Sequence, residues 1–435
     1  MFLLLSTLVF SQEEVPFSIR FKEYLRGDLT FVANNIVNRN DNKNANEAYN
    51  KEGQQSELND TFYMSYIDID NDKSTFSSSS ATFSKKENTN DIVFAGLYWS
   101  ATYNYPLSIK DNGIYIHEGN RESNFNEIKI KIPLQDNYLD IKGQLIYDGF
   151  NDVRHNTNSP YVCFYDLTEM VKSNPYGEYT VANIRSTEGF IEGGISGGWI
   201  LYFVYKDDKT TQKYITLYDG FASVYDMPIQ IKLTNFQTPK IGIINSKIAL
   251  ATLEGDASIK GDNVSLKNIS NNTYFPVFSK NRDSQNLFNS QITIENDPFL
   301  ERNPTSLNTL GFDALIISLN NQNNQIINNN TTETELKIAS VGDKSYLFSA
   351  GFMIDVDKEF YEQNTKEIIT NNTVVIPKKE KKKKTLKILN NVTGISIVVK
   401  EILSSVVQKD EDEMVEEKSV EKSIEETGNL TIKKI

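Results

Sequence analysis

The stretch that decides the fold is Trp199-Ile-Leu-Tyr-Phe-Val-Tyr205, seven apolar or aromatic residues that follow the turn-like segment Gly193-Gly-Ile-Ser-Gly-Gly198. Short runs of β-branched and aromatic residues bounded by turn residues are typical of buried β-strands. Similar runs recur on both sides of it, separated by clusters of glycine, asparagine and aspartate. They are Asp91–Trp99, Tyr179–Ile184, Tyr214–Tyr218, Ile248–Leu253 and Ala314–Ser318.

Helical periodicity is scarce between these runs, and Tyr165–Val171 is the best short candidate for a helix. Many short strands without long helices between them favour an all-β fold, an antiparallel β-sandwich or jelly roll. A break near Met227–Pro239 divides the strands into two predicted lobes, residues 13–230 and 231–360.

The C-terminal part has a different character. A basic block, Lys378–Lys384, and an acidic block, Asp410–Glu413, lie in a region with few aromatic residues. Blocks of like charge usually mark solvated linkers or interaction tails. We therefore predict that residues 361–435 form a charged, largely disordered tail.

The N-terminus predicts export. Residues 1–10 are an almost continuous apolar run, Ser11-Gln12 closes it, and Glu13 and Glu14 begin polar sequence. This pattern matches the apolar region and cleavage site of a secretory signal peptide, although the usual basic residues before the run are missing. We predict a signal peptide over residues 1–12, with a buried strand as the alternative.

Composition excludes several classes of function. The chain has 435 residues and a formal charge of −13, from 45 Lys and Arg against 58 Asp and Glu, which argues against nucleic acid as a partner. One cysteine and two histidines leave little for disulfides, zinc sites or imidazole catalysis. We expect both histidines, His117 and His155, to be exposed and inert, and Cys163 to be buried. No stretch has 18 consecutive apolar residues, so no transmembrane segment is expected.

The sharpest local pattern is Tyr66-Ile-Asp-Ile-Asp-Asn-Asp72, in which Asp68, Asp70 and Asp72 alternate with other residues. An extended backbone would place the three carboxylates on one side, and Ca²⁺ prefers several oxygen ligands together. The glycine and the glutamate of an EF-hand loop are missing, so the segment is not an EF-hand. A half-buried strand with outward-facing aspartates is the alternative to a calcium site. A cation shared by Asp256 and Asp262 is a weaker candidate, because the flanking glycines suit tight turns and the spacing does not support a metal site.

Other candidate site residues are aromatic or lie near glycines. Trp99 and Trp199 are predicted to be core residues, whereas Tyr103 and Tyr105 are expected to face solvent and to offer a platform for sugar rings. Ser196 lies among glycines, but we interpret this segment as a turn and not as a nucleophile loop. We predict no catalytic residues.

Several segments resemble the β-rich N-terminal region of large secreted surface proteins of Bacteroidota, which are associated with type IX secretion and with gliding-type adhesins. The resemblance covers about residues 26–356. The segments that carry it are Gly27–Asn38, Tyr66–Ala81, Ala95–Tyr103, Tyr179–Arg185, Ile215–Phe221, Ala251–Asp256 and Asn308–Asp313. Such proteins usually continue into repeat arrays and a C-terminal sorting domain, whereas this chain has a short charged tail.

The resemblance implies an exported, non-catalytic, adhesin-like or structural binding module at the cell surface of a Gram-negative bacterium. Its expected partner is a surface glycan, a protein ligand or a component of the envelope or secretion machinery. One alternative is a carbohydrate-active jelly-roll enzyme, which facing carboxylates in a cleft would indicate. Another is a periplasmic accessory of surface-adhesin assembly, docked through its tail.

Overall fold

A computed structural model describes residues 13–41, 44–50, 58–85, 91–225, 227–372, 420–424 and 430–434. Strands account for 50% of the structure and helices for 6%. The strand pairs are antiparallel with two exceptions, β6 with β13 and β20 with β23. The prediction of an all-β, antiparallel sandwich fold is confirmed.

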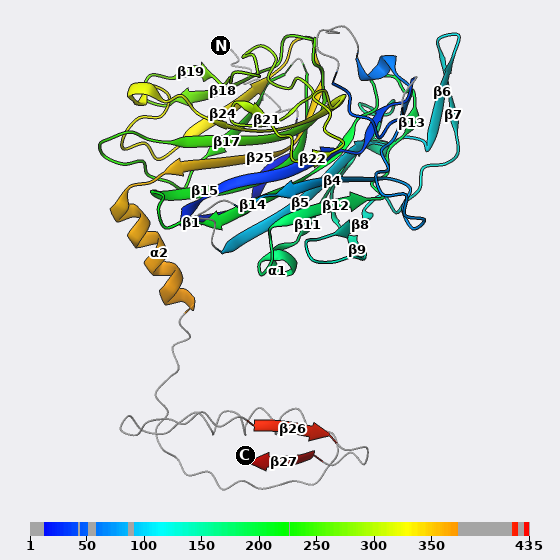
Figure 1. The fold of residues 1–435 in the computed structure, drawn as a ribbon. Coiled ribbons are helices and arrows are strands. Elements are labelled where there is room, and N and C mark those ends of the chain that lie inside the picture. The colour runs from blue at the N-terminus through cyan, green and yellow to red at the C-terminus, as the bar shows by residue number, and fades with distance from the viewer. Residues whose placement is uncertain are drawn as a thin grey trace, which may run out of the picture. The chain divides into compact units, whose positions relative to one another are not determined.

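The largest sheet has eleven strands, and its long members run side by side across the body (Figure 1). Its order is β10 (Gln144–Asp148), β11 (Pro160–Asp166), β5 (Ile92–Thr102), β14 (Gly197–Lys206), β1 (Glu13–Asn35), β15 (Gln212–Val224), β25 (Ser345–Asp355), β17 (Ser246–Gly255), β23 (Gly311–Ser318), β20 (Ile292–Ile294) and β21 (Asp297–Pro298). Strand β1 joins the two halves of this sheet. Its residues 27–35 pair with β14, and its residues 13–26 pair with β15 through several register shifts.

Three smaller sheets accompany it. The first is β22 (Arg302–Asn303), β4 (Ser78–Phe83), β12 (Gly177–Ala182), β8 (Glu127–Lys131) and β9 (Leu139–Lys142). The second is β2 (Val37–Arg39), β3 (Met64–Tyr66), β13 (Glu188–Gly189), β6 (Leu107–Asp111) and β7 (Ile114–Glu118). The third is β16 (Ile229–Leu233), β24 (Thr334–Ala339), β18 (Asn263–Asn268) and β19 (Thr273–Pro276).

Helices are few and short in the described residues. They are α1 (Thr168–Val171), α2 (Lys358–Asn372) and the 3₁₀ turns η1 (Asn59–Thr61), η2 (Gly149–Asn151) and η3 (Gln322–Asn324). Helix α1 lies within the segment predicted as helical. None of the helices in the described part of the chain is long and apolar enough to span a bilayer.

The apolar side chains form three cores. The first lies between the β10–β1 half of the large sheet and the β4–β12 sheet, and it contains Trp99 and Trp199, both completely buried as predicted. The second lies between the β15–β21 half and the β16–β19 sheet. The third lies between the two halves of the large sheet: the Tyr98 hydroxyl on β5 donates to Asp219 on β15, and the Tyr202 hydroxyl on β14 contacts Ser349 on β25.

The third core explains the continuous apolar runs of the sequence. Along β14, Trp199, Leu201 and Phe203 enter the first core, while Ile200 and Tyr202 enter the third. A strand buried on both faces needs apolar residues at every position, whereas a half-exposed strand alternates. The most apolar strands therefore lie in the middle of the molecule, between two sandwiches that share β1.

The predicted segments map onto this architecture as follows. The proposed boundary between residues 230 and 231 lies within β16, whose apolar residues belong to the second core, as does Tyr214 on β15. Contacts divide the chain into units 1–373 and 374–435. The predicted signal peptide lies outside the described residues, as does most of the predicted tail. From residue 361 onwards the structure describes the end of α2 and a hairpin of β26 (Val420–Ile424) and β27 (Leu430–Lys434).

Candidate ligand-binding pocket

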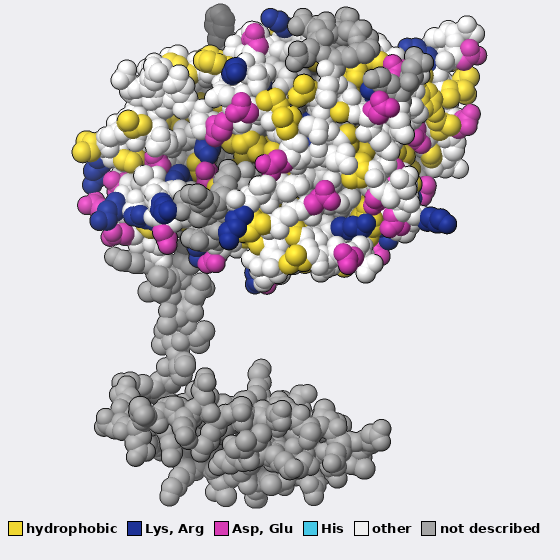
Figure 2. Space-filling view, viewed as in Figure 1, with side chains coloured by type: hydrophobic (Ala, Val, Ile, Leu, Met, Phe, Trp, Pro, Cys, Tyr) yellow, Lys and Arg dark blue, Asp and Glu magenta, His cyan; other side chains and the backbone are white. Residues whose placement is uncertain are grey.

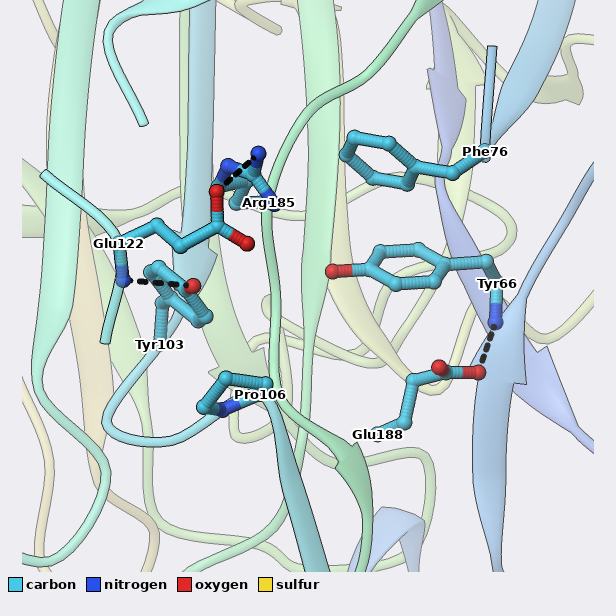
Figure 3. A pocket seen from close by; sticks show the side chains of 7 residues that line it. All are labelled: Tyr66, Phe76, Tyr103, Pro106, Glu122, Arg185 and Glu188. Carbon is cyan, nitrogen blue, oxygen red and sulfur yellow. Dashed lines mark hydrogen bonds and ion pairs between the residues drawn. The ribbon is translucent and has the colours of Figure 1, made fainter. Parts of the chain in front are cut away.

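A cavity of about 570 Å³ opens where the second small sheet meets the loops that follow β5, β7 and β12. We call it the aromatic–acidic pocket. Its lining residues are Tyr66, Phe76, Tyr103, Pro106, Glu122, Arg185 and Glu188 (Figure 3). They come from five separate segments of the chain, so the pocket exists only when the sheet has formed.

Aromatic rings form one wall of the pocket. Tyr66, the last residue of β3, and Phe76, in the loop before β4, meet edge to face with ring centroids 5.0 Å apart. The Tyr66 hydroxyl donates to the Ser186 carbonyl at 2.6 Å and accepts from the Ser186 N–H at 2.8 Å. Because this hydroxyl already has both a donor and an acceptor, Tyr66 offers its ring face to the cavity.

Opposite Tyr66 lies an ion pair (Figure 3). The Arg185 guanidinium is 2.5 Å from a Glu122 carboxylate oxygen, and Asn124 accepts a second hydrogen bond from the Arg185 Nε at 2.9 Å. The guanidinium carbon also lies 5.0 Å from the Phe76 ring centroid, a cation–π distance. Three partners therefore hold Arg185 in place, while half of the Glu122 side chain stays exposed.

A second carboxylate, Glu188 on β13, lines the pocket beside Tyr66. One of its oxygens accepts from the Tyr66 backbone N–H at 3.3 Å. Burial raises the pKa of Glu188 above its usual value, and hydrogen bonds from Tyr66 and Ser65 oppose that rise. The pocket therefore holds two acids in different environments, one paired with arginine and one without a cation among its described neighbours.

The two tyrosines predicted to form a sugar platform differ in their exposure to solvent. Tyr103 lines the pocket, but only 1% of its surface is exposed, so the prediction that it faces solvent is wrong. It is buried because its hydroxyl accepts the Glu122 backbone N–H at 3.0 Å and Arg121 lies over its ring. Tyr105 is partly exposed and stacks on His117 with centroids 4.1 Å apart.

The three aspartates predicted as calcium ligands lie just outside the pocket, after Tyr66. The strand ends at Tyr66, and Asn71 has a left-handed φ of 52°, so the expected extended alternation does not continue to Asp72. The carboxylates cap the turn instead: Asp70 accepts from the Asp72 backbone N–H, and Asp72 accepts from the Ser74 N–H.

Donors of the protein also surround the side chain of Asp70. It accepts from Ser78, from the Tyr138 hydroxyl at 2.5 Å and from Lys131 at 3.4 Å. Burial acts to raise its pKa, but these hydrogen bonds outweigh burial and lower it. The described residues contain no group of three or more His, Cys, Asp or Glu side chains placed to hold a metal ion. Calcium binding at Asp68, Asp70 and Asp72 stays a prediction.

Other residues singled out from the sequence are structural. Cys163 is completely buried, as predicted. His155 is also buried, at 1% exposure, so the expectation that it is exposed is wrong: its ring packs among Tyr147, Phe221 and Tyr346, and its Nε2 lies 3.2 Å from Glu14. Ser196 is buried, and its hydroxyl donates to Glu254 at 2.5 Å.

Four pocket residues were not predicted as site residues from the sequence: Phe76, Glu122, Arg185 and Glu188. The resemblance segment Tyr179–Arg185 ends at Arg185, but nothing in the local sequence links that arginine to Glu122 or to Tyr66. The pairing of β13 with β3 brings Glu188 beside Tyr66, and Phe76, Glu122 and Arg185 reach the pocket from loops outside that sheet.

Comparisons with known proteins do not assign the chain to a family. No family model matches the chain, and no curated protein sequence matches it significantly. Three solved structures resemble it weakly. The major capsid protein P2 of bacteriophage PM2 is 9% identical over 63% of this chain and 97% of its own, with a TM-score of 0.18. PNGase F, a glycosylasparaginase from Flavobacterium meningosepticum, is 10% identical over 75% and 96%, with a TM-score of 0.18. A chain of the Sulfolobus turreted icosahedral virus is 12% identical over 79% and 81%, with a TM-score of 0.16. Scores this low carry no argument about function.

Proposed function

We propose that this protein is an exported, non-catalytic, adhesin-like module of a bacterial cell surface that binds a glycan in the aromatic–acidic pocket. The observation that carries the proposal is the combination of exposed ring faces with charged hydrogen-bonding groups in one cavity. Sugars present C–H faces that pack on aromatic rings and hydroxyls that both donate and accept hydrogen bonds. Phe76 and Tyr66 supply the faces, the carboxylates of Glu122 and Glu188 accept, and Arg185 donates.

The net charge of the pocket favours some kinds of glycan over others. Two carboxylates and one guanidinium give it a net negative charge when all three are ionised. Neutral or amino sugars suit this charge, whereas an acidic glycan would meet repulsion from Glu188.

Glycan binding by the purified full chain tests the proposal. Wild type is titrated with neutral, amino and acidic oligosaccharides, and the bound ligand is then titrated into the variants Phe76→Ala and Arg185→Ala. Phe278→Ala and Arg154→Ala are matched controls, because both side chains are exposed and neither lines the pocket. Affinity lost only in the two pocket variants supports the proposal. No binding by wild type, or equal loss in the controls, contradicts it.

A carbohydrate-active enzyme is the second candidate, favoured by the two carboxylates of the pocket and by the raised pKa of Glu188. A general acid needs such a pKa, and a partner carboxylate across the substrate completes the machinery. Incubation of the bound glycan with wild type and with Glu188→Gln separates the two functions. Product formation that Glu188→Gln abolishes would replace the binding proposal, whereas recovery of intact glycan supports it.

Cell-surface location has its own test. Protease treatment of intact cells, with a periplasmic protein as the control, should digest the protein if it lies outside the outer membrane. Protection until the outer membrane is opened would contradict the surface location and favour a periplasmic accessory.

A further inference from the structure

Four carboxyl groups lie near the end of β17 and in the loops beside it, three of them buried and Asp256 half-buried. We call Glu254, Asp256, Asp262 and Asp343 the buried carboxyl cluster. Asp262 is completely buried, and Asp343 and Glu254 are 4% and 6% exposed. Glu254 is the only member bound by two neutral side chains, accepting from Ser196 and from Asn59. Among the described residues, none of the three aspartates forms an ion pair.

Two cations of this region have other partners. Lys344 acts on Glu254, but its ammonium group donates to the Arg154 carbonyl at 3.4 Å. Arg282 lies 2.7 Å from Asp313, with both side chains completely buried, and it also donates to the carbonyls of Leu287 and Gln291. Its charge is therefore matched by Asp313. The cluster keeps an excess of acids over cations, which burial makes unfavourable unless protons or a bound cation neutralise it.

Two buried oxygens of this region have no hydrogen-bond partner. Asp262 accepts from the Phe288 N–H through one oxygen, at 2.7 Å, and its other oxygen, Oδ1, has no donor within the described residues. Asn286, 6% exposed, donates its Nδ2 to the Ala257 carbonyl, which leaves its buried Oδ1 without a partner. A β-bridge joins residues 262 and 286, so the two oxygens belong to neighbouring residues.

A second carboxyl group, Asp343, lies near this pair, because the two loops that carry them approach each other: Gly342 packs against the Lys260 carbonyl, and Gly261 packs against the Val341 backbone. The Asp256 N–H donates to Asp343 at 3.1 Å, which places the loop before β25 against the loop after β17. Burial is the main reason why the pKa of Asp343 rises to about 9, and repulsion from Asp256, Asp262 and Glu254 adds to the rise. The Asp262 carboxylate is among the acids that raise the pKa of Asp343, which agrees with the approach of the two loops.

We propose that Asp262, Asp343 and the side-chain oxygen of Asn286 bind a hard divalent cation of the calcium type. Carboxylate and amide oxygens without donors are the ligands that such an ion prefers. Because no three acidic, His or Cys side chains gather around one point in the described residues, the ion would take two carboxylates and complete its shell with amide, main-chain and water oxygens. A site of this kind suits Ca²⁺, with its large and flexible coordination shell, and not Zn²⁺. It is distinct from the aspartates at 68, 70 and 72, whose carboxylates accept hydrogen bonds from the protein itself.

Calorimetric titration and thermal melts of the full chain test this site. The protein is stripped with EDTA at pH 7 and titrated with CaCl₂ and, separately, with MgCl₂. The variant Asp262→Asn removes one charge but keeps an acceptor for the Phe288 N–H. Asp70→Asn is the matched control, since it removes a charge at the sequence-predicted aspartates.

We expect wild type and Asp70→Asn to bind one calcium ion per chain and to melt at a higher temperature with calcium than with EDTA. Asp262→Asn should lose both effects. Its midpoint in EDTA should be no lower than that of wild type, because the substitution removes buried repulsion.

Several results would overturn the proposal: a wild type that binds neither ion, calcium binding retained by Asp262→Asn, or binding that Asp70→Asn abolishes. If Asp262→Asn does not fold, Asp343→Asn takes its place, and the wild-type titration remains decisive.

Discussion

Acidic side chains have contrasting environments in the aromatic–acidic pocket and in the buried carboxyl cluster. In the pocket, Glu122 is half exposed and paired with Arg185, so its charge is stabilised by water and by a guanidinium. In the cluster, Glu254 is almost fully buried, its hydrogen bonds come from the neutral side chains of Ser196 and Asn59, and Lys344 is a nearby cation that does not form an ion pair with it. Charges that water and a cation stabilise are available for ligand recognition, whereas buried charges without partners depend on protons or ions. Acidic side chains are therefore solvated and paired in one region, and are buried with raised pKa values in the other.

This contrast extends across the molecular surface. On the face shown in Figure 2, Lys and Arg side chains lie interspersed with Asp and Glu side chains. Two acids with large rises in pKa, Glu254 and Asp343, are instead buried inside the protein.

The largest expected effect comes from Glu254→Gln measured without divalent cations. Burial raises the pKa of Glu254 from 4.5 to about 8, so the folded state holds a proton that the unfolded state releases between these values. The contribution of Glu254 to stability should therefore be complete below about pH 4.5 and be lost as pH rises towards 8. Each pKa unit corresponds to about 1.4 kcal/mol, so the whole fall amounts to at most about 4–5 kcal/mol.

Urea unfolding between pH 5 and 8 in EDTA measures this effect. Gln resembles the protonated acid, so Glu254→Gln should flatten the pH profile and be more stable than wild type at pH 8. Parallel profiles for the two proteins would show that Glu254 does not titrate in this range.

The next effect concerns recognition in the pocket. Arg185→Lys keeps the positive charge but loses the planar group that contacts Glu122, Asn124 and the Phe76 ring. We expect at least a tenfold loss of glycan affinity, about 1.4 kcal/mol, with a change in unfolding free energy of less than about 1 kcal/mol. Titration calorimetry and urea unfolding on the same samples separate the two. Unchanged affinity would mean that charge alone is recognised.

A smaller effect, opposite in sign to that of Glu254→Gln, is expected for Asp70→Asn. The hydrogen bonds from Tyr138, Ser78 and the Asp72 N–H favour the charged form of Asp70 and lower its pKa. Its contribution to stability is therefore present above about pH 4 and is lost as pH falls through the lowered pKa. The variant should be less stable than wild type by about 1–2 kcal/mol at pH 7, and the difference should shrink towards pH 3. A stabilised variant would remove the contrast between the two regions.

The smallest effect is expected for Lys129→Ala. Lys129 lies 2.6 Å from Asp140, but 82% of the Asp140 side chain is exposed. Exposed ion pairs contribute on the order of 0–1 kcal/mol, and salt screens them. Unfolding at 0.05 and 0.5 M NaCl should show a difference below about 0.5 kcal/mol that disappears at high salt. A larger loss would show that the pair supports the β8–β9 hairpin.

The local sequence was sufficient for the strands and for several core residues. Trp99, Trp199 and Cys163 lie in apolar runs, and their complete burial follows from that pattern. The prediction that His155 is exposed was wrong because its neighbours in the sequence are polar. Its neighbours in space are the aromatic rings of Tyr147, Phe221 and Tyr346. The prediction that extended backbone continues to Asp72 was also wrong. The side chains of Asp70 and Asp72 accept hydrogen bonds from nearby backbone N–H groups, which favours a turn.

By itself the sequence determined that the chain builds antiparallel β-sheets with a large aromatic core, because strand formation depends on patterns a few residues long. The tertiary structure alone decided that two sandwiches share β1 and a common core, since this requires pairing between strands far apart in the chain. It also decided which carboxylates obtain donors. Arg185 lies 63 positions after Glu122, and Ser78 lies 8 positions after Asp70, yet each donor reaches its carboxylate. One oxygen of Asp262, in contrast, is buried without a donor among the described residues. Solvation and hydrogen bonding depend on neighbours in space, and only the folded chain sets those neighbours.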